Sequence, residues 1–260
     1  MKILNHAFRS FFVNLRLFII VFWLLILIFI LKIFSFFITN DIRFRKFRIF
    51  LQMVFCRLML FLAGIKVVLK NKEGFFNKQK NCLIVSNHQS YWDVITLASL
   101  APMVFISNTE VEQTKGLGLI SRSGGAIFIN RIDKKQVIKD IKAVSELLKQ
   151  GFDVVLFPEG TTSDGKNMLP FKAPFFKSAI DAEKNIFLVC IIYKNTNGDN
   201  IGEKMVYHSN ESFLKHFKKI ISMEDKRVEI NFLGELPYSS DRKNLVNKSY
   251  LMIKNTFEKK

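Results

Sequence analysis

Cysteine and histidine are scarce in this chain of 260 residues, and neither occurs in a metal-binding arrangement. The three cysteines, Cys56, Cys82 and Cys190, are far apart and odd in number, which argues against a disulfide framework and against a zinc site. The four histidines contain no pair at the spacing of metal ligands, so we predict no structural metal. Isolated cysteines of this kind are compatible with a reducing compartment.

Acidic residues are also few, and the shortage is concentrated at the amino end. The chain has 39 lysines and arginines against 22 aspartates and glutamates, a net charge of +17. Residues 1–70 contain 11 basic residues and one acidic residue, whereas residues 71–260 contain 28 and 21. A soluble nucleic-acid-binding module would interleave aromatic with basic residues, and that pattern is missing, so we predict no nucleic-acid partner. Basic charge beside apolar sequence instead predicts attraction to an anionic membrane surface, worth roughly 1 kcal/mol per basic residue.

The longest apolar run begins at residue 17 and is free of charged and strongly polar residues as far as residue 31. It continues after Lys32 to residue 38, and about twenty residues span a hydrocarbon core, so residues 17–38 are long enough to cross a membrane. The run is too long for a signal peptide and is not followed by a small-x-small cleavage site. Basic residues flank it on both sides, which fits a single span or a re-entrant segment. The denser cluster behind it favours a cytoplasmic main domain.

A second apolar stretch, residues 49–69, is interrupted by polar residues and a glycine. It is too polar for a comfortable span and is typical of an amphipathic helix in the membrane interface or packed against the first helix. A core helix of a soluble domain is the alternative. We therefore predict a hydrophobic, membrane-anchoring helical region over residues 1–70 and a globular domain over residues 71–260.

After residue 70, short apolar runs alternate with amphipathic segments. The apolar runs predict strands at 82–86, 126–129, 153–157, 186–193 and 228–232. The amphipathic segments predict helices at 90–100, 133–150, 174–183 and from about 240. Alternation of this kind predicts an α/β domain with a mostly parallel central sheet covered by helices.

One candidate site follows the first predicted strand, where the chain reads Asn87-His88-Gln-Ser-Tyr-Trp-Asp93. Sites in open α/β folds gather at the carboxyl ends of strands. There, a neutral imidazole of His88 can take a proton from an alcohol, and Asp93 can hold the other ring nitrogen. Asp93 is also at an ordinary capping position of the following helix, and the sequence leaves both interpretations open.

Two further segments carry groups of possible chemical use. Glu159-Gly160-Thr161 follows a predicted buried strand, where an acid usually has a partner or a role, and the backbone amides after Gly160 could face an oxyanion. A simple strand-to-loop turn is the alternative. Arg131 follows another predicted strand and could hold a phosphate with two hydrogen bonds; a solvated loop cation is its alternative.

In this order and at these intervals, the three segments resemble the motifs of the glycerolipid acyltransferases, typified by bacterial 1-acyl-glycerol-3-phosphate acyltransferase. The N-H-x4-D block stands at Asn87–Asp93, the G-x-x-F-I-x-R block at Gly125–Arg131, and the F-P-E-G-T-R-S block at Phe157–Ser163. Leu169–Lys172 resembles the segment after the third block. The resemblance covers about residues 75–235 and is highly specific in combination.

The resemblance implies an acyltransferase domain over residues 71–260 that needs no metal or cofactor. A fatty acyl group would pass directly from an acyl thioester, either acyl-CoA or acyl-carrier protein, to the hydroxyl of a lysolipid. The default acceptor is 1-acyl-sn-glycerol-3-phosphate, which would give phosphatidate. We expect a membrane location, the bacterial inner membrane with the catalytic domain on its cytoplasmic side.

The resemblance also implies a role for each matching residue. His88 would deprotonate the acceptor hydroxyl, Asp93 would orient His88, and Arg131 would bind the acceptor's phosphate. Glu159 and Gly160 would shape the acceptor site. The remaining residues predicted to bind substrate are Asn87, Thr161, Thr162 and Lys172.

The chain departs from the family pattern at three places. Thr162 replaces the arginine of E-G-T-R, Asn108 replaces a common lysine, and Val189-Cys190 replaces the usual V-P. The loss of the arginine removes one presumed phosphate ligand, and the surrounding sequence resembles the branch of lyso-ornithine lipid acyltransferases, whose acceptor has no phosphate. A thioester hydrolase is a weaker alternative, because no G-x-S-x-G elbow is present. The last alternative is a non-catalytic, membrane-anchored lipid-binding protein.

Overall fold

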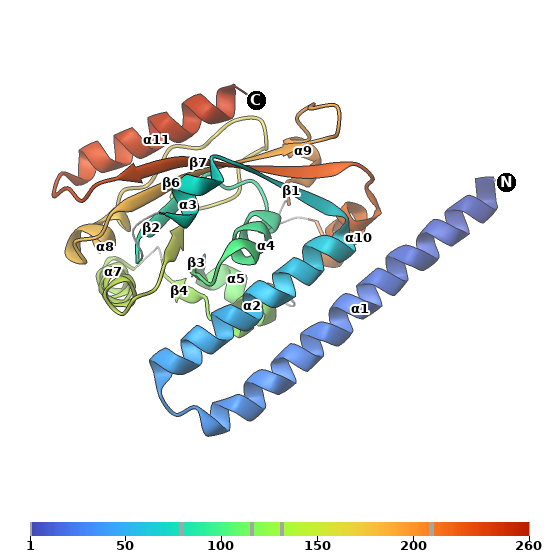
Figure 1. The fold of residues 1–260 in the computed structure, drawn as a ribbon, viewed down its shortest axis with the longest axis horizontal. Coiled ribbons are helices and arrows are strands. Elements are labelled where there is room, and N and C mark those ends of the chain that lie inside the picture. The colour runs from blue at the N-terminus through green and yellow to red at the C-terminus, as the bar shows by residue number, and fades with distance from the viewer. Residues whose placement is uncertain (1, 78–80, 115–116, 131–132, 208–210, 260) are drawn as a thin grey trace.

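A seven-stranded sheet organises the computed structural model, which describes residues 2–77, 81–114, 117–130, 133–207 and 211–259. The strand order is β1-β7-β6-β2-β5-β3-β4, and every neighbouring pair is parallel except β6 with β7. The strands are β1 (Ile65–Lys70), β2 (Leu83–Ser86), β3 (Val104–Asn108), β4 (Ile127–Ile129), β5 (Val154–Leu156), β6 (Ile186–Lys194) and β7 (Lys226–Leu236). The predicted α/β class with a mostly parallel sheet is confirmed (Figure 1).

Helices cover both faces of the sheet, because alternate strand residues point to opposite faces and both sets are apolar. Ile84 of β2 lies in a core with α1, α2, α4 and α10, whereas Leu83 and Val85 lie in a core with α7, α8 and α11. The helices are α1 (Lys2–Phe37), α2 (Asp41–Ala63), α3 (Lys72–Phe76), α4 (Tyr91–Leu100), α5 (Thr109–Gln113), α6 (Leu117–Ser123), α7 (Lys134–Lys149), α8 (Phe176–Asp181), α9 (Gly202–Met205), α10 (Phe213–Ser222) and α11 (Arg242–Glu258).

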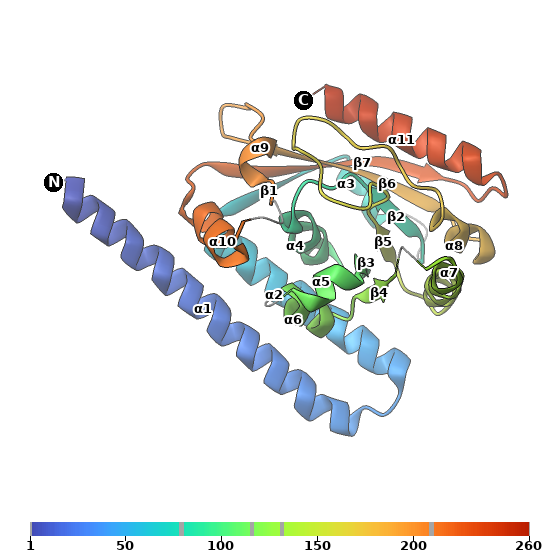
Figure 2. The ribbon, with the colours of Figure 1, turned by 180° about the vertical axis from the view of Figure 1, so that it is seen from behind.

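Helices α1 and α2 form an antiparallel pair along one side of the domain (Figures 1 and 2). Asn40 starts α2 by accepting a hydrogen bond from the backbone N–H of Arg43. Gly64 ends the helix in the left-handed conformation, with φ of 67°. The prediction of one helix over 49–69 is therefore wrong at its carboxyl end, because Ile65–Lys70 forms β1 and pairs with β7.

The apolar run predicted at 17–38 lies in α1, and residues Ser10–Phe37 are long and apolar enough to cross a membrane by length and composition. One side of α1 packs on the protein, where Ile20, Leu27 and Leu31 are buried. Most other hydrophobic side chains of α1 are exposed, as Phe36 is at 82%. Helix α2 also packs against α4, so it connects α1 to the core beneath the sheet.

Strand β6 extends beyond its neighbour β2 at the carboxyl end of the parallel strands. Its residues Ile186–Val189 pair with Leu83–Ser86, where β2 ends, but β6 continues to Lys194. The overhang, residues 190–194, remains paired with β7 on its other side. Its edge toward β2 is consequently free to hold the chain that follows β2.

Candidate active site

His88 and Asp93 lie together at the carboxyl end of β2. The Nδ1 atom of His88 is 2.9 Å from Oδ2 of Asp93. The same Oδ2 accepts hydrogen bonds from the backbone N–H groups of Gln89 at 2.6 Å and Ser90 at 2.8 Å. Ser90 precedes α4 and Asp93 is its third residue, so both interpretations of this aspartate hold. One carboxylate caps the helix and fixes the imidazole.

This arrangement leaves one ring nitrogen available for chemistry. Because the carboxylate of Asp93 accepts from Nδ1–H, the neutral imidazole carries its lone pair on Nε2. The His88 side chain is 18% exposed, while Asp93 is fully buried. The ring of Phe157 stacks on the imidazole, with centroids 4.2 Å apart, and limits its rotation. A partly exposed basic nitrogen on a fixed ring is what a general base requires.

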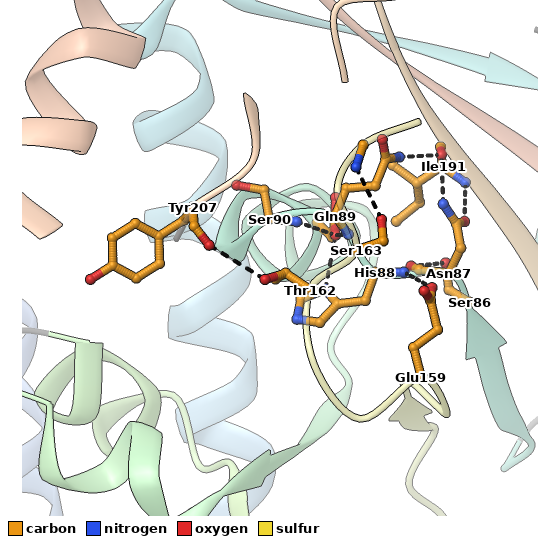
Figure 3. Close-up of polar contacts among 12 residues, drawn as sticks. Ser86, Asn87, His88, Gln89, Ser90, Glu159, Thr162, Ser163, Ile191 and Tyr207 are labelled. Carbon is orange, nitrogen blue, oxygen red and sulfur yellow. Dashed lines mark hydrogen bonds and ion pairs between the residues drawn. The ribbon is translucent and has the colours of Figure 1, made fainter. Parts of the chain in front are cut away.

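Asn87 fastens the segment before His88 to the overhang of β6 (Figure 3). Its side-chain Nδ2 donates to the carbonyl oxygen of Ile191 at 2.9 Å, and the N–H of Ile191 donates to its Oδ1 at 2.7 Å. Nε2 of Gln89 donates to the same carbonyl oxygen at 2.9 Å. Asn87 is only 1% exposed, and its side-chain amide holds one end of residues 87–93, the catalytic segment. A direct contact of Asn87 with substrate stays a prediction.

Glu159 connects the first and third motifs. The residue is 2% exposed; Oε1 accepts from the backbone N–H of His88, and Oε2 accepts from that of Leu169, both at 2.7 Å. Burial raises the pKa of Glu159 to about 7, although the two backbone donors act in the opposite direction. Glu159 therefore links its own loop to the segments of His88 and Leu169 through backbone groups. Figure 3 shows the contact with His88.

The turn after Glu159 passes close to His88. Gly160 has φ of 80°, in the left-handed region that favours glycine. The backbone N–H of Ser163 donates to the carbonyl oxygen of His88 at 2.8 Å, so the motif segments are joined at a second point. Thr161 is exposed between these contacts.

Thr162 and Lys172 are the two other predicted ligands on this loop. The Thr162 hydroxyl donates to the carbonyl oxygen of Tyr207 at 3.4 Å, a long hydrogen bond to the segment between α9 and α10. The Lys172 backbone N–H donates to the carbonyl oxygen of Pro158 at 2.8 Å, and its side chain is exposed. The remaining predicted ligand, Arg131, lies outside the described residues.

A cavity of about 140 Å³ adjoins the third motif. It is lined by Val137, Leu156, Phe157, Pro158, Gly160, Lys172, Pro174 and Phe175. Phe157 also stacks on His88, so the same residue borders the cavity and contacts the imidazole. The cavity thus lies beside the base, with an exposed lysine at its margin.

Two residues of the site lie outside the three sequence motifs and were not predicted from the sequence. Tyr193, in the overhang of β6, donates its hydroxyl hydrogen to Oδ1 of Asp93 at 2.5 Å. Ile191 acts through its backbone alone. Both belong to a uniformly apolar strand, which signals burial and gives no sign of a site.

Comparison with known proteins agrees with this geometry. The profile of the Acyltransferase family matches residues 66–194. The 1-acyl-sn-glycerol-3-phosphate acyltransferase of Neisseria gonorrhoeae is 30% identical over 168 residues. That match covers 64% of this chain and 65% of the relative, a little less than two thirds of its length. The resemblance of the motifs to the acyltransferases is thus confirmed, and residues 66–194 match an Acyltransferase domain.

Members with different named acceptors are similar to this chain. The lyso-ornithine lipid O-acyltransferase of Rhizobium meliloti is 32% identical over 126 residues, which cover 48% of this chain and 42% of that protein. The crystal structure of the 1-acyl-sn-glycerophosphate (LPA) acyltransferase from Thermotoga maritima has the same fold, with a TM-score of 0.70. It is 18% identical, and the alignment covers 100% of this chain and 97% of that one.

The other two departures from the family pattern have structural positions. Asn108 ends β3 and precedes α5, so it is at the same edge of the sheet as the site. Val189 and Cys190 are fully buried in β6, and Cys190 begins the overhang that holds Asn87. The pairing of β6 with β7 shifts register between Leu188 and Val189, and β6 continues past this point to Ile191, whose backbone reaches Asn87.

Proposed function

We propose that this protein transfers a fatty acyl group from an acyl thioester to the free hydroxyl of a lysolipid. The first acceptor we assign is 1-acyl-sn-glycerol-3-phosphate, with phosphatidate as product. The observation that carries the proposal is the partly exposed imidazole of His88, with Nδ1 held by a buried carboxylate and Nε2 left unengaged by it. The names of the Neisseria relative and of the Thermotoga protein support the choice of acceptor.

The chemistry follows from the position of Nε2. This nitrogen removes the proton of the acceptor hydroxyl, while Asp93 stabilises the imidazolium that forms. The alkoxide attacks the thioester carbonyl, the C–S bond breaks, and the proton on Nε2 passes to the leaving thiolate. His88 is thereby restored and no acyl-enzyme forms. The donor is acyl-CoA or acyl-carrier protein, since both present the same thioester.

The headgroup of the acceptor would lie beside the third motif. We assign Arg131, Thr161 and Lys172 to its polar contacts, and Gly160 to the close approach of the backbone. Thr162 is neutral where the family motif has an arginine, and its hydroxyl donates to the Tyr207 carbonyl oxygen. The lack of a cation at this position supports a second acceptor, lyso-ornithine lipid, which the Rhizobium relative names.

The helical region over residues 1–70 would hold the domain at the membrane. Phe18, Phe36 and Phe61 are more than half exposed on α1 and α2, and exposed apolar surface of this kind is unfavourable in water. Ile20 and Leu27 of α1 pack on the protein, which favours a helical pair lying along the bilayer over a free span. Basic residues beside this surface would bind anionic headgroups on the cytoplasmic side of a bacterial inner membrane.

The test is product formation by purified protein in vesicles, with a labelled acyl thioester and one acceptor at a time. Phosphatidate from lysophosphatidate supports the first acceptor, and acylation of lyso-ornithine lipid alone replaces it with the second. Release of free fatty acid without acceptor would identify a hydrolase. His88→Ala should reduce the rate by roughly two to four orders of magnitude at unchanged melting temperature. Undiminished turnover by this variant would refute the mechanism.

A further inference from the structure

The carboxylate of Asp93 has an unusually complete set of donors for a fully buried group. Oδ2 accepts from Nδ1 of His88 and from two backbone N–H groups, as described above. Oδ1 accepts from the Tyr193 hydroxyl at 2.5 Å, which is short and typical of a charge-assisted O–H···O⁻ bond. A buried carboxylate oxygen without a donor is costly, so this single contact matters to Asp93.

Tyr193 is suited to hold Asp93 still. It lies in the overhang of β6, 1% exposed, and belongs to the same core as Trp92 of α4. Burial, with the nearby charge of Asp93, raises the pKa of Tyr193 well above its ordinary value, so the hydroxyl remains a donor. The bond therefore spans from a central strand to the first turn of α4.

The contact also determines which carboxylate oxygen serves His88. With Oδ1 held by Tyr193, the plane of the carboxylate is fixed, and Oδ2 remains directed at the imidazole and the two backbone amides. Without the hydroxyl, Oδ1 has no donor from β6, and more of the negative charge acts on the His88 imidazolium. We propose that Tyr193 is a positioning residue of the acyl-transfer site, which acts through Asp93 on the orientation and basicity of His88. This inference rests on the proposed role of His88 as the general base.

Tyr193→Phe is the appropriate change, because it removes one oxygen and keeps the ring in the core. We expect kcat to fall about 10- to 100-fold, the effect of losing a hydrogen bond to a charged group, with KM for donor and acceptor within about twofold. The acidic limb of the pH profile of kcat/KM should move to higher pH, because the His88 imidazolium becomes more stable. A purely structural role would change melting temperature without moving this limb.

A second measurement does not depend on turnover. Carbethoxylation of His88, followed by mass spectrometry as a function of pH, reports the pH at which its imidazole loses a proton. The midpoint should be higher in Tyr193→Phe than in the parent. Tyr91→Phe is the matched control, since Tyr91 is also a buried tyrosine but its hydroxyl contacts His216, 3.0 Å away. Burial raises the pKa of Glu159, the other carboxyl group hydrogen bonded at His88, to about 7. Neither substitution changes a hydrogen-bond partner of Glu159, so we expect its contribution to cancel from the comparison.

The two measurements separate the possible outcomes. A higher midpoint in Tyr193→Phe alone supports the inference, whether or not a given lysolipid is turned over. An unchanged midpoint, or an equal shift in Tyr91→Phe, overturns it. In the Asp93→Asn background, Tyr193→Phe should reduce kcat little further, because the two residues act as one unit; multiplicative losses would also overturn it. Failure of every acceptor in the parent protein would instead refute the proposed function.

Discussion

Replacing Glu159 with glutamine tests the carboxyl group that joins the two halves of the site. Both carboxyl oxygens accept from backbone N–H groups, those of His88 and Leu169. A glutamine of the same shape offers one acceptor oxygen and turns its NH2 group toward the other donor. One buried backbone N–H is then left without an acceptor, which costs about 1–3 kcal/mol of folding free energy.

The pH dependence of this loss has a definite sign. Burial raises the pKa of Glu159 from 4.5 to about 7 in the folded protein. The folded state therefore binds a proton more readily than the unfolded state, and stability from this group is fully present below about pH 4.5 and lost as the pH rises through 7. At 1.36 kcal/mol for each tenfold change in proton affinity, the loss amounts to about 3 kcal/mol. Glutamine cannot ionise, so Glu159→Gln should be much less stable than the parent at pH 5 and similar to it at pH 8.

The assay is urea unfolding of both proteins in detergent micelles between pH 5 and pH 8, expressed as a difference in free energy of unfolding. Other titrating groups cancel in this difference. Glu146→Gln is the matched control, because Glu146 is an exposed glutamate that pairs with Lys149 on α7, and its difference should be nearly independent of pH. The reasoning would be refuted if the loss of unfolding free energy in Glu159→Gln, relative to the parent, stayed constant or increased as the pH rises. That result would mean that the two backbone donors outweigh burial and keep Glu159 ionised.

Other substitutions test the remaining parts of the proposal. Asp93→Asn should reduce kcat by about 100-fold or more, since the amide favours the wrong imidazole tautomer, and loss of the helix cap should lower unfolding free energy by about 1 kcal/mol. Lys172→Ala should raise KM for an anionic acceptor several-fold, whereas Lys177→Ala, another exposed lysine nearby, should leave it unchanged in the same vesicle assay. Phe61→Asp, at a side chain that is 80% exposed on α2, should weaken vesicle co-sedimentation at least several-fold; Leu251→Asp on α11 should not.

The sheet could be predicted where its strands are short apolar runs between polar residues. The runs at β2, β4, β5, β6 and β7 each correspond to a predicted strand. Strands β1 and β3 were not predicted. Strand β1 was missed because Lys66 and Lys70 interrupt its apolar residues, which made it look like the end of an amphipathic helix. Its strand conformation depends on pairing with β7, whose residues are distant in sequence, and no local pattern encodes that contact.

The site was predictable as a set of residues but not as a set of contacts. The motif spacing indicated that His88 and Asp93 would work together, and they are hydrogen bonded. The resemblance implied a substrate role for Asn87 and Glu159, which stays a prediction. It gave no sign that their polar atoms hold backbone groups of Ile191, His88 and Leu169. A motif records which residues are needed, and burial determines whether a polar side chain meets a ligand or the protein itself.

The overhang of β6 explains why a base can stand at the end of so short a strand. β2 ends at Ser86, and the next residues have no strand neighbour of their own to fix them. Backbone groups of Ile191 hold Asn87 and Gln89, and the Tyr193 hydroxyl holds Asp93, so both ends of the catalytic segment are fastened to one strand. Antiparallel pairing with β7 keeps that overhang rigid where β2 no longer supports it. The one antiparallel pair of the sheet, β6 with β7, is thus part of what positions the His88 imidazole.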